Sequence, residues 1–312
     1  MDLKTQIEAA RRSVLAVPRP DLATLEVSGA DRISWLNGLL TCNLVKRAPG
    51  QALYGLVVAR SGRVLSDAVV VLDGSEPGEA IVRLVVPSSA VAELLEHLRH
   101  YLVMEDVELT HHADASVAWA LHGPRSIDVL AAAKAAGAWG GVFDATGLGG
   151  AIVLIPTTDL QGTRAALQAS ITAAMGVVGD DDGWEALRIE RAVPRFGRDF
   201  DAKTYPQEAG LERTAVSFDK GCYLGQEVVC MLEMRGHVKR KLVALVLDGA
   251  LPDRGAPVTD AGGAAAGEVT SSALSPATGK PVALAMLKRA YTEPGTRLLV
   301  AGANALVVDR PA

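Results

Sequence analysis

The sequence is poor in aromatic residues and has no excess of positive charge. Only 4% of its 312 residues are aromatic, so a stacking surface for single-stranded nucleic acid is not expected. Lys and Arg total 31 against 36 Asp and Glu, which gives a formal net charge of −5. Because non-specific nucleic-acid binding depends on positive charge that displaces counterions, we predict no strong direct nucleic-acid partner.

Cysteine is also scarce, and long apolar runs are missing. Cys42, Cys222 and Cys230 are too few and too scattered for a disulfide framework, and an odd number of thiols fits a reducing compartment. No Cys-x-x-Cys or His-x-x-x-His spacing occurs, so no metal site of the usual kind is predicted. Residues 1–20 lack a secretory apolar segment, and no run reaches the roughly 18 apolar residues that cross a bilayer. We expect a cytoplasmic protein with no membrane partner.

What the chain does have is enough apolar residues, 49%, to build large cores. Residues 50–72 alternate in hydrophobicity on both sides of a Ser-Gly turn, which predicts a β-hairpin. Strand–helix–strand patterns of this kind favour antiparallel α+β lobes over a doubly wound sheet. Short strands between Gly and Pro turns then predict an all-β C-terminal domain. We expect lobes at residues 1–112, 113–237 and 238–312.

The most unusual stretch is the octapeptide from Lys220 to Glu227, which combines a thiol, a cation, two glycines and a carboxylate. A neighbouring Lys220 and a helix that starts after Gly225 would both favour the Cys222 thiolate. Cys222 is therefore a candidate reactive or ligand-facing thiol. The alternative is a small buried residue in a glycine-rich turn, because free Cys is among the most buried residue types.

A second cluster places four arginines within eleven residues: Arg188, Arg191, Arg195 and Arg198. Planar guanidinium groups suit the bidentate binding of a carboxylate, such as the glutamate tail of a folate. The alternative is simple pairing with Glu185 or Glu190 along one helix. For Arg188 alone, helix pairing is the favoured interpretation.

Asp67 lies within an otherwise apolar strand and needs a donor to offset its desolvation. A ligand N–H group and a backbone N–H group at a bulge serve this need equally well, and both alternatives stay open. A separate basic run, Arg235 to Lys241, could contact an acidic partner and act as an adaptor surface. The solvated face of an edge strand is the favoured interpretation of that run.

Several motifs together match a known protein family. They are Arg188-Ile189-Glu190, Pro194-Arg195-Phe196-Gly197, Pro206-Gln207-Glu208-Ala209-Gly210-Leu211 and Lys220-Gly221-Cys222-Tyr223-x-Gly225-Gln226-Glu227. The chain resembles the YgfZ-type folate-binding proteins, which are relatives of the glycine cleavage T-protein and of the mitochondrial iron–sulfur assembly factor. Weaker matches extend the resemblance over the whole chain.

This resemblance implies a three-lobed, glycine cleavage T-protein-like arrangement, with two antiparallel α+β lobes and a C-terminal β-barrel around a central channel. It implies tetrahydrofolate in that channel and assistance to iron–sulfur cluster assembly or repair, including that of tRNA-modifying enzymes. The partners implied are folate and iron–sulfur client or assembly proteins. By position, Cys222 is the functional thiol and Lys220 its companion. The residues implied to bind the cofactor are Asp67, Arg188, Glu190, Gln226 and Glu227.

Three departures from related patterns bear on function. Met231 stands where the family often has a basic residue, and Thr41-Cys42-Asn43 replaces a more usual Thr-Asn-Asp. Residues 144–151 lack the Gly-Tyr-Thr-Gly-Glu segment of T-proteins, which argues against aminomethyl transfer. The alternative function is nevertheless a tetrahydrofolate-dependent aminomethyltransferase or demethylase, with Asp67 as its carboxylate. Whether the protein is an enzyme stays open at this point.

Overall fold

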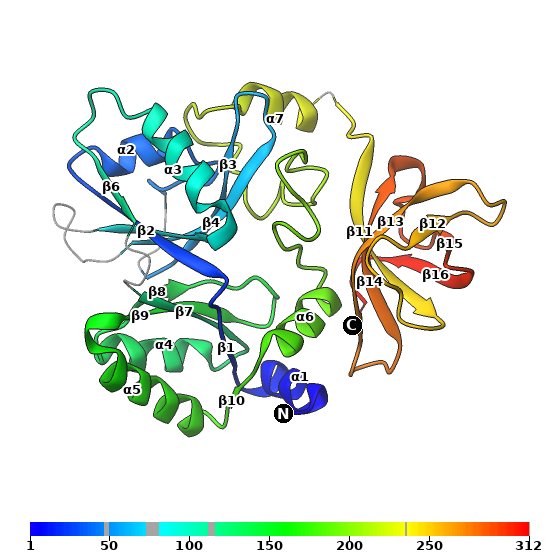
Figure 1. The fold of residues 1–312 in the computed structure, drawn as a ribbon, viewed down its shortest axis with the longest axis horizontal. Helices are drawn as coiled ribbons and strands as arrows, with labels where there is room; N and C mark the ends of the chain where they lie inside the picture. Colours follow the sequence, from blue (N-terminus) through cyan, green and yellow to red (C-terminus); the bar gives the residue numbers. More distant parts are fainter. Residues whose placement is uncertain (47–49, 73–80, 112–115, 235, 312) are drawn as a thin grey trace.

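The computed structural model describes residues 1–46, 50–72, 81–111, 116–234 and 236–311. Its elements form two five-stranded sheets with helices and a closed barrel. Figure 1 shows the sheets on the left, one above the other, and the barrel on the right. A long connection with little regular structure, residues 191–225, runs between them.

The first sheet is antiparallel throughout, with the strand order β3-β4-β5-β2-β6. Its strands are β2 (Leu22–Ser28), β3 (Leu53–Val58), β4 (Val64–Leu72), β5 (Val82–Pro87) and β6 (Glu108–His111). The outer face is covered by α2 (Arg32–Asn37) and α3 (Val91–His100), and η1 (Ser88–Ala90) precedes α3. Leu36, Leu84 and Leu94 pack together between this sheet and its helices. The alternating strands and amphipathic helices expected here therefore form one core.

The second sheet has the order β10-β1-β7-β9-β8, and only the β1–β10 pair is parallel. Its strands are β1 (Leu15–Pro18), β7 (Ser116–His122), β8 (Trp139–Val142), β9 (Gly150–Pro156) and β10 (Val177–Val178). The helices of this part are α1 (Leu3–Arg12), α4 (Ser126–Ala135), α5 (Leu160–Ala173) and α6 (Asp181–Glu190), with η2 (Thr157–Asp159) before α5. Helices α4 and α5 cover one face, while α1 and α6 pack on residues such as Leu15 and Val17.

The N-terminal segment does not stay with the first lobe. Residues Leu15–Pro18 pair antiparallel with β7, and α1 packs against α6, so both elements belong to the second sheet. Their apolar side chains find a buried face there, because the first sheet already has its own helices. The chain then enters the first sheet at Leu22. Residues 1–112 are thus not one unit, and the boundary expected at 112 and 113 falls outside the described residues.

The inner faces of the two sheets pack on each other. Val69, Val71 and Val85 of the first sheet contact Ala118 and Ile152 of the second. Helices α2 and α3 cover the outer side of the first sheet and α4 and α5 that of the second (Figure 1), while α1 and α6 pack on Leu15 and Val17 at the β1 edge. Asp67 has the same strand parity as Val69, so its side chain faces this inner side.

The C-terminal part is a closed antiparallel barrel of six strands. They are β11 (Arg240–Asp248), β12 (Pro257–Thr259), β13 (Ala265–Leu274), β14 (Pro281–Lys288), β15 (Arg297–Val300) and β16 (Ala303–Val308), with η3 (Arg289–Tyr291) after β14. Helix α7 (Gln226–Met234) precedes the barrel. The expected three-lobed arrangement of two α+β lobes and a C-terminal barrel is thereby confirmed.

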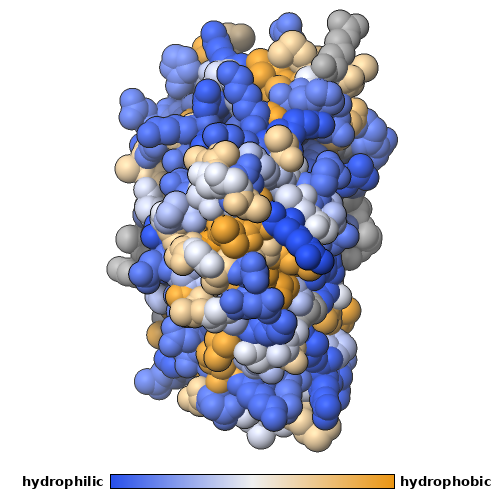
Figure 2. Space-filling model, turned by 90° about the vertical axis from the view of Figure 1, so that its right-hand side faces the viewer, coloured by the Kyte–Doolittle hydropathy of each residue, from blue (hydrophilic) through white to orange (hydrophobic). Residues whose placement is uncertain are grey.

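The face of the molecule on the barrel side is mostly hydrophilic, with some apolar side chains gathered near its middle (Figure 2). The barrel residues with large exposed apolar side chains are Leu251, Leu274 and Leu306. Within the described part of the chain, no helix is both long enough and apolar enough to cross a bilayer.

Candidate functional site

The β3–β4 hairpin brings together Tyr54 and Asp67 on the inner face of the first sheet. Leu56 lies directly opposite Asp67 in the strand register, so Tyr54 is its diagonal neighbour on the same face. The Tyr54 hydroxyl donates a hydrogen bond of 2.9 Å to Asp67 Oδ2. The donor that Asp67 requires is therefore a phenol, which neither of the two alternatives from the sequence had named.

Tyr54 and Asp67 combine partial exposure with an interior position. Both side chains are half-buried, yet burial is the largest cause that raises the pKa of each. The Tyr54 ring lies 5.7 Å from the Phe143 ring, which is also half-buried and belongs to the second lobe. Tyr54, Asp67 and Phe143 thus lie together where the two lobes meet, and this group of three side chains is called the inter-lobe site below.

Two charged residues from the β1–β2 connection, Arg19 and Asp21, influence the ionisation of Asp67. They also pair with each other. Arg19 donates to both oxygens of Asp21, at 2.8 and 2.7 Å, and Arg195 adds a third bond of 2.9 Å. Burial opposes ionisation of Asp21, but the two guanidinium groups lower its pKa to about 2. Arg19 lowers the pKa of Asp67 while Asp21 raises it. Since the two neighbours act in opposite directions, burial decides the direction of the Asp67 shift.

Two stacked aromatic rings of the second lobe lie beside the Arg19 guanidinium. His122 stacks on Trp184 with ring centroids 4.5 Å apart, and the Arg19 guanidinium lies 5.3 Å from the Trp184 centroid. Burial lowers the pKa of His122 to about 3, so this imidazole is neutral at physiological pH. A general base at neutral pH needs a group that titrates nearer to neutrality, and His122 does not meet that condition.

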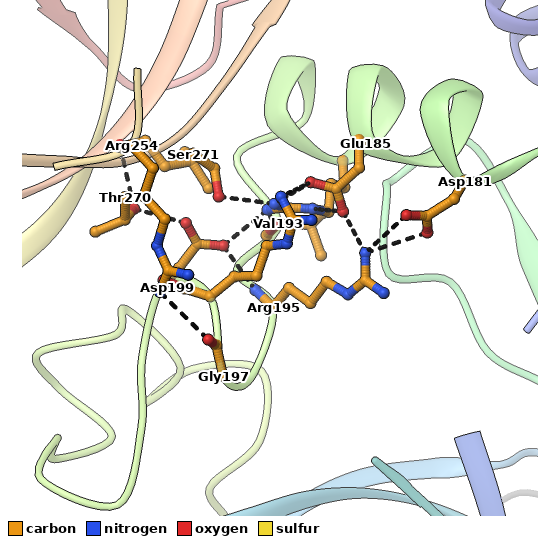
Figure 3. A network of polar contacts seen from close by, with 12 residues as sticks. Asp181, Glu185, Val193, Arg195, Gly197, Asp199, Arg254, Thr270 and Ser271 are labelled. Atoms are coloured by element: carbon orange, nitrogen blue, oxygen red, sulfur yellow. Dashed lines mark hydrogen bonds and ion pairs between the residues drawn. The ribbon is translucent and has the colours of Figure 1, made fainter. Parts of the chain in front are cut away.

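Arg188 donates the hydrogen bonds that join α6 to the following loop and to the barrel, and its partners are labelled in Figure 3. Its side chain is completely buried, and it contacts Glu185, Val193, Asp199 and Ser271. All five of its N–H groups are engaged in these bonds. Pairing with Glu185 follows the helix alternative. The expected folate contact of Arg188 stays a prediction. In this structure every N–H group of its guanidinium is already used in the bonds above.

Glu190 is also part of the packing between lobes. Its buried carboxylate accepts hydrogen bonds from Arg11 of α1, at 3.2 Å, and from the Ser275 hydroxyl and the Ala277 N–H group of the barrel. These bonds attach the end of α6 to both neighbouring parts. The expected cofactor contact of Glu190 is not tested by these contacts and stays a prediction.

Lys220 supports the backbone rather than the neighbouring thiol. Its ammonium donates three hydrogen bonds of 2.7 Å to the carbonyl oxygens of Asn37, Leu40 and Cys42. Burial lowers the pKa of Lys220 to about 8, although the three acceptors favour the charged form. Lys220 thus fastens the octapeptide to the segment after α2. Its expected catalytic role stays a prediction, and its visible role is structural.

The other octapeptide residues divide between packing and exposure. A Cβ atom at Gly225 would lie 2.4 Å from the Ala59 carbonyl oxygen, and its φ is +76°, so glycine lets α7 approach the β3–β4 turn. Gln226 accepts a bond of 3.3 Å from the Tyr223 N–H group, while Glu227 is exposed at the start of α7. Cys222 is exposed. Within the described part, no hydrogen bond or ion pair joins Cys222, Gln226 or Glu227 to Asp67.

The basic run before the barrel is partly paired. Arg240 contacts Glu208 at 3.1 Å and Lys241 contacts Glu212 at 3.2 Å, while Arg235 lies outside the described residues. These pairs tie β11 to the long connection.

A cavity of about 360 Å³ lies between the long connection and the barrel. Its charged lining residues are Arg198, Asp199, Asp201, Lys203, Arg240, Arg254 and Glu268. Because cations and carboxylates nearly balance there, the lining selects no single sign of charge.

Sequence reasoning missed Tyr54, Arg19 and Asp21 as site residues. The hairpin alternation contained the signal for Tyr54, because it predicts that Tyr54 shares a face with Leu56. The exact cross-strand register was needed to place Asp67 beside it. No local signal connects Arg19 or Asp21 to that hairpin, since the contact depends on how the N-terminal segment passes from one sheet to the other.

Comparison with known proteins supports a single family over nearly the whole chain. The GCVT N-terminal domain matches residues 2–139, and the glycine cleavage T-protein C-terminal barrel domain matches residues 240–311. An aminomethyltransferase from Exiguobacterium sibiricum is 30% identical over 309 residues, covering 93% of this chain and 82% of that relative. The chain belongs to the glycine cleavage T-protein family. An aminomethyltransferase from Rippkaea orientalis is 28% identical and covers 99% of this chain and 89% of the relative.

A solved structure supports the same fold. The glycine cleavage system aminomethyltransferase T from Bartonella henselae superposes with a TM-score of 0.83 at 20% identity, covering 99% of this chain and 89% of the other. At this identity, the likeness establishes the three-lobed fold of the T-protein family and nothing further.

These findings correct the YgfZ-type assignment. The curated relatives are named aminomethyltransferase, so the assignment to the YgfZ type is wrong, and so is the iron–sulfur assembly function that it implied. The expected iron–sulfur partners and the link to tRNA modification lose their support with it. Within the octapeptide, Lys220 and Gly225 serve local packing, whereas Cys222 and Glu227 are exposed. The alternative function, aminomethyl transfer, is the one that the relatives favour. Tetrahydrofolate as the expected cofactor is confirmed at the level of the family.

Proposed function

We propose that the protein is a tetrahydrofolate-dependent aminomethyltransferase of the T-protein type. The observation that carries this proposal is the half-buried Asp67 carboxylate, which Tyr54 holds on the inner face between the lobes. Burial raises the pKa of this carboxylate above its usual value, which makes it a stronger proton acceptor than an exposed aspartate. The names of the relatives support the same reaction.

The inter-lobe site has the properties that a reduced folate requires. Tyr54 and Phe143 offer half-buried aromatic surface, and Asp67 offers a carboxylate that accepts hydrogen bonds from N–H groups. Tetrahydrofolate, when bound, supplies the amine nitrogen that accepts the one-carbon unit. Asp67 would orient an N–H group of this ligand and take up or return its proton. The lobes on both sides would exclude bulk water, which strengthens each electrostatic contact.

A cytoplasmic location is part of the proposal. The three cysteines support it, since all of them are free thiols in the structure.

The proposal is tested by a glycine-cleavage assay with purified components. We expect tetrahydrofolate-dependent turnover by the natural protein and a loss of about 10²- to 10³-fold in Asp67→Asn, which keeps the shape but removes the proton acceptor. Asp260→Asn is the matched control, because Asp260 accepts a tyrosine hydrogen bond at 3.0 Å in the barrel instead. Absence of turnover in the natural protein, or full activity in Asp67→Asn, contradicts the proposal.

A further inference from the structure

We propose that Tyr54 is a positioning residue for the reaction at Asp67: its hydroxyl fixes one carboxylate oxygen, so that the other faces the ligand in the ionised state. This inference rests on the proposed function and adds to it a second residue with a separate role. Tyr54 touches the carboxylate and acts through it, whereas Asp67 contacts the reacting amine.

The geometry of the pair supports this division of roles. The Tyr54 hydroxyl bonds to Oδ2, and among the described residues no other side chain donates to Asp67. Oδ1 is therefore without a side-chain donor, on a residue that keeps accessible surface. A carboxylate held at one oxygen has its plane and direction set, while the other oxygen stays available to a ligand.

Tyr54 is itself held firmly enough to direct its neighbour. Its ring packs against Phe143 of the second lobe and beside the cluster that contains Leu56 and Phe200. Tyr54 and Asp67 lie on adjacent strands of one hairpin, so their backbones move together. These contacts limit rotation of the phenol ring, while its hydroxyl is hydrogen-bonded to Oδ2.

The charges around Asp67 leave Tyr54 as the neighbour that opposes burial. The groups facing Asp67 are Tyr54 from β3 and Arg19 and Asp21 from the β1–β2 connection, and Arg195 from the long connection holds Asp21. Arg19 lowers the pKa of Asp67 and Asp21 raises it. Burial raises this pKa most, and the Tyr54 hydrogen bond is the largest influence that lowers it. Removing the hydroxyl should therefore raise the pKa of Asp67 further.

The decisive variant is Tyr54→Phe, which deletes the hydroxyl and keeps the ring. We expect the acidic limb of the kcat/KM profile to move to higher pH by about one unit, since a hydrogen bond to a charged group shifts its titration by that order. The sign follows because activity needs ionised Asp67, and the variant loses ionisation at a higher pH. A carboxyl-carbon NMR titration of Asp67 should show the same upward shift without any substrate.

Tyr291→Phe is the matched control, because it deletes the same kind of bond, from Tyr291 to Asp260, in the barrel. Its acidic limb and the Asp67 titration should match those of the natural protein. An unshifted Asp67 titration in Tyr54→Phe overturns the inference, even if kcat falls, because a purely structural residue would lower activity without moving the titration. If the natural protein shows no aminomethyl transfer, the proposed function fails, and the NMR titration still decides the role of Tyr54.

Discussion

Two tyrosine–aspartate pairs in this molecule have nearly the same hydrogen bond and opposite electrostatics. Tyr54 donates to Asp67 over 2.9 Å in the inter-lobe site, and Tyr291 donates to Asp260 over 3.0 Å at the barrel. Burial raises the pKa of Asp67, whereas backbone N–H groups of the turn at residues 262–264 and the Tyr291 hydroxyl lower that of Asp260. The surroundings, not the shared phenol, set the direction of the shift.

This difference explains why only one of the two pairs is suited to chemistry. Asp260 accepts two backbone N–H bonds of 2.9 Å, from Gly262 and Ala264, so its charge is satisfied within its own turn. Asp67 has only the phenol as a side-chain donor among the described residues and lies between lobes. A carboxylate that is incompletely satisfied can exchange a hydrogen bond or a proton with a ligand at low cost.

The largest expected effect is the loss of stability when a buried carboxylate loses its cationic partner. The Asp199 side chain is completely buried, and its Oδ2 forms an ion pair of 2.7 Å with Nη1 of Arg188. Arg188→Met should lower the free energy of unfolding by about 3–5 kcal/mol, because it leaves the buried Asp199 carboxylate without its counterion. Urea denaturation measures this change.

Arg198→Met is the control for that experiment. Arg198 is half-exposed and contacts Glu185 only at 3.5 Å, so a change within about 0.5 kcal/mol is expected. Equal effects of the two substitutions would show that burial of the network does not determine its contribution.

A smaller effect is expected at the octapeptide. Lys220→Met removes the donor shared by three carbonyl oxygens and should lower the free energy of unfolding by about 1–3 kcal/mol. Cys222→Ser changes an exposed side chain and should leave both stability and aminomethyl transfer unchanged. Loss of transfer activity in a stable Cys222→Ser protein would return the thiol to the reaction and contradict its peripheral place.

The smallest expected effect is a pH-dependent change in stability, which should have opposite signs for substitutions of Asp67 and Asp260. Folding raises the pKa of Asp67 above its usual 3.8, so the folded state holds its proton longer and stability falls as pH rises through the raised pKa. Asp67→Asn removes this loss, so its free energy of unfolding should no longer fall as pH rises through that range.

Asp260→Asn should have the opposite sign. The pKa of Asp260 is lowered on folding, so its contribution is present above pH 3.8 and lost as pH falls through the lowered pKa. Denaturation curves of both variants at low and high pH measure the two slopes. Slopes of the same sign would contradict the comparison of the two pairs.

Local pattern was sufficient for much of the fold. Alternation around residues 50–72 correctly predicted the β3–β4 hairpin, and short strands after residue 238 correctly predicted a separate β domain. These features depend on neighbours in sequence, which periodicity reports directly. The place of β1 in the second sheet could not be predicted, because its partner β7 lies about a hundred residues away.

The candidate site shows the same limit. Asp67 was recognisable because a carboxylate in an apolar strand needs a donor, and this physical requirement is visible in sequence. The identity of the donor was not, and the specific octapeptide drew attention to Cys222 and Lys220 instead. A motif reports that residues are constrained, and both packing and chemistry constrain them.

By itself, the amino-acid order determined the hairpin, the helices, the barrel strands and the presence of one carboxylate out of place among apolar neighbours, since each is set by side chains close together along the chain. Only the tertiary structure decided that Tyr54 donates a hydrogen bond to Asp67. It also decided that Arg19 and Asp21 shift the pKa of Asp67 in opposite directions. It also placed Arg188 and Lys220 in hydrogen bonds to other parts of the chain. Burial and charge pairing arise between distant segments, and they set which groups are free to react.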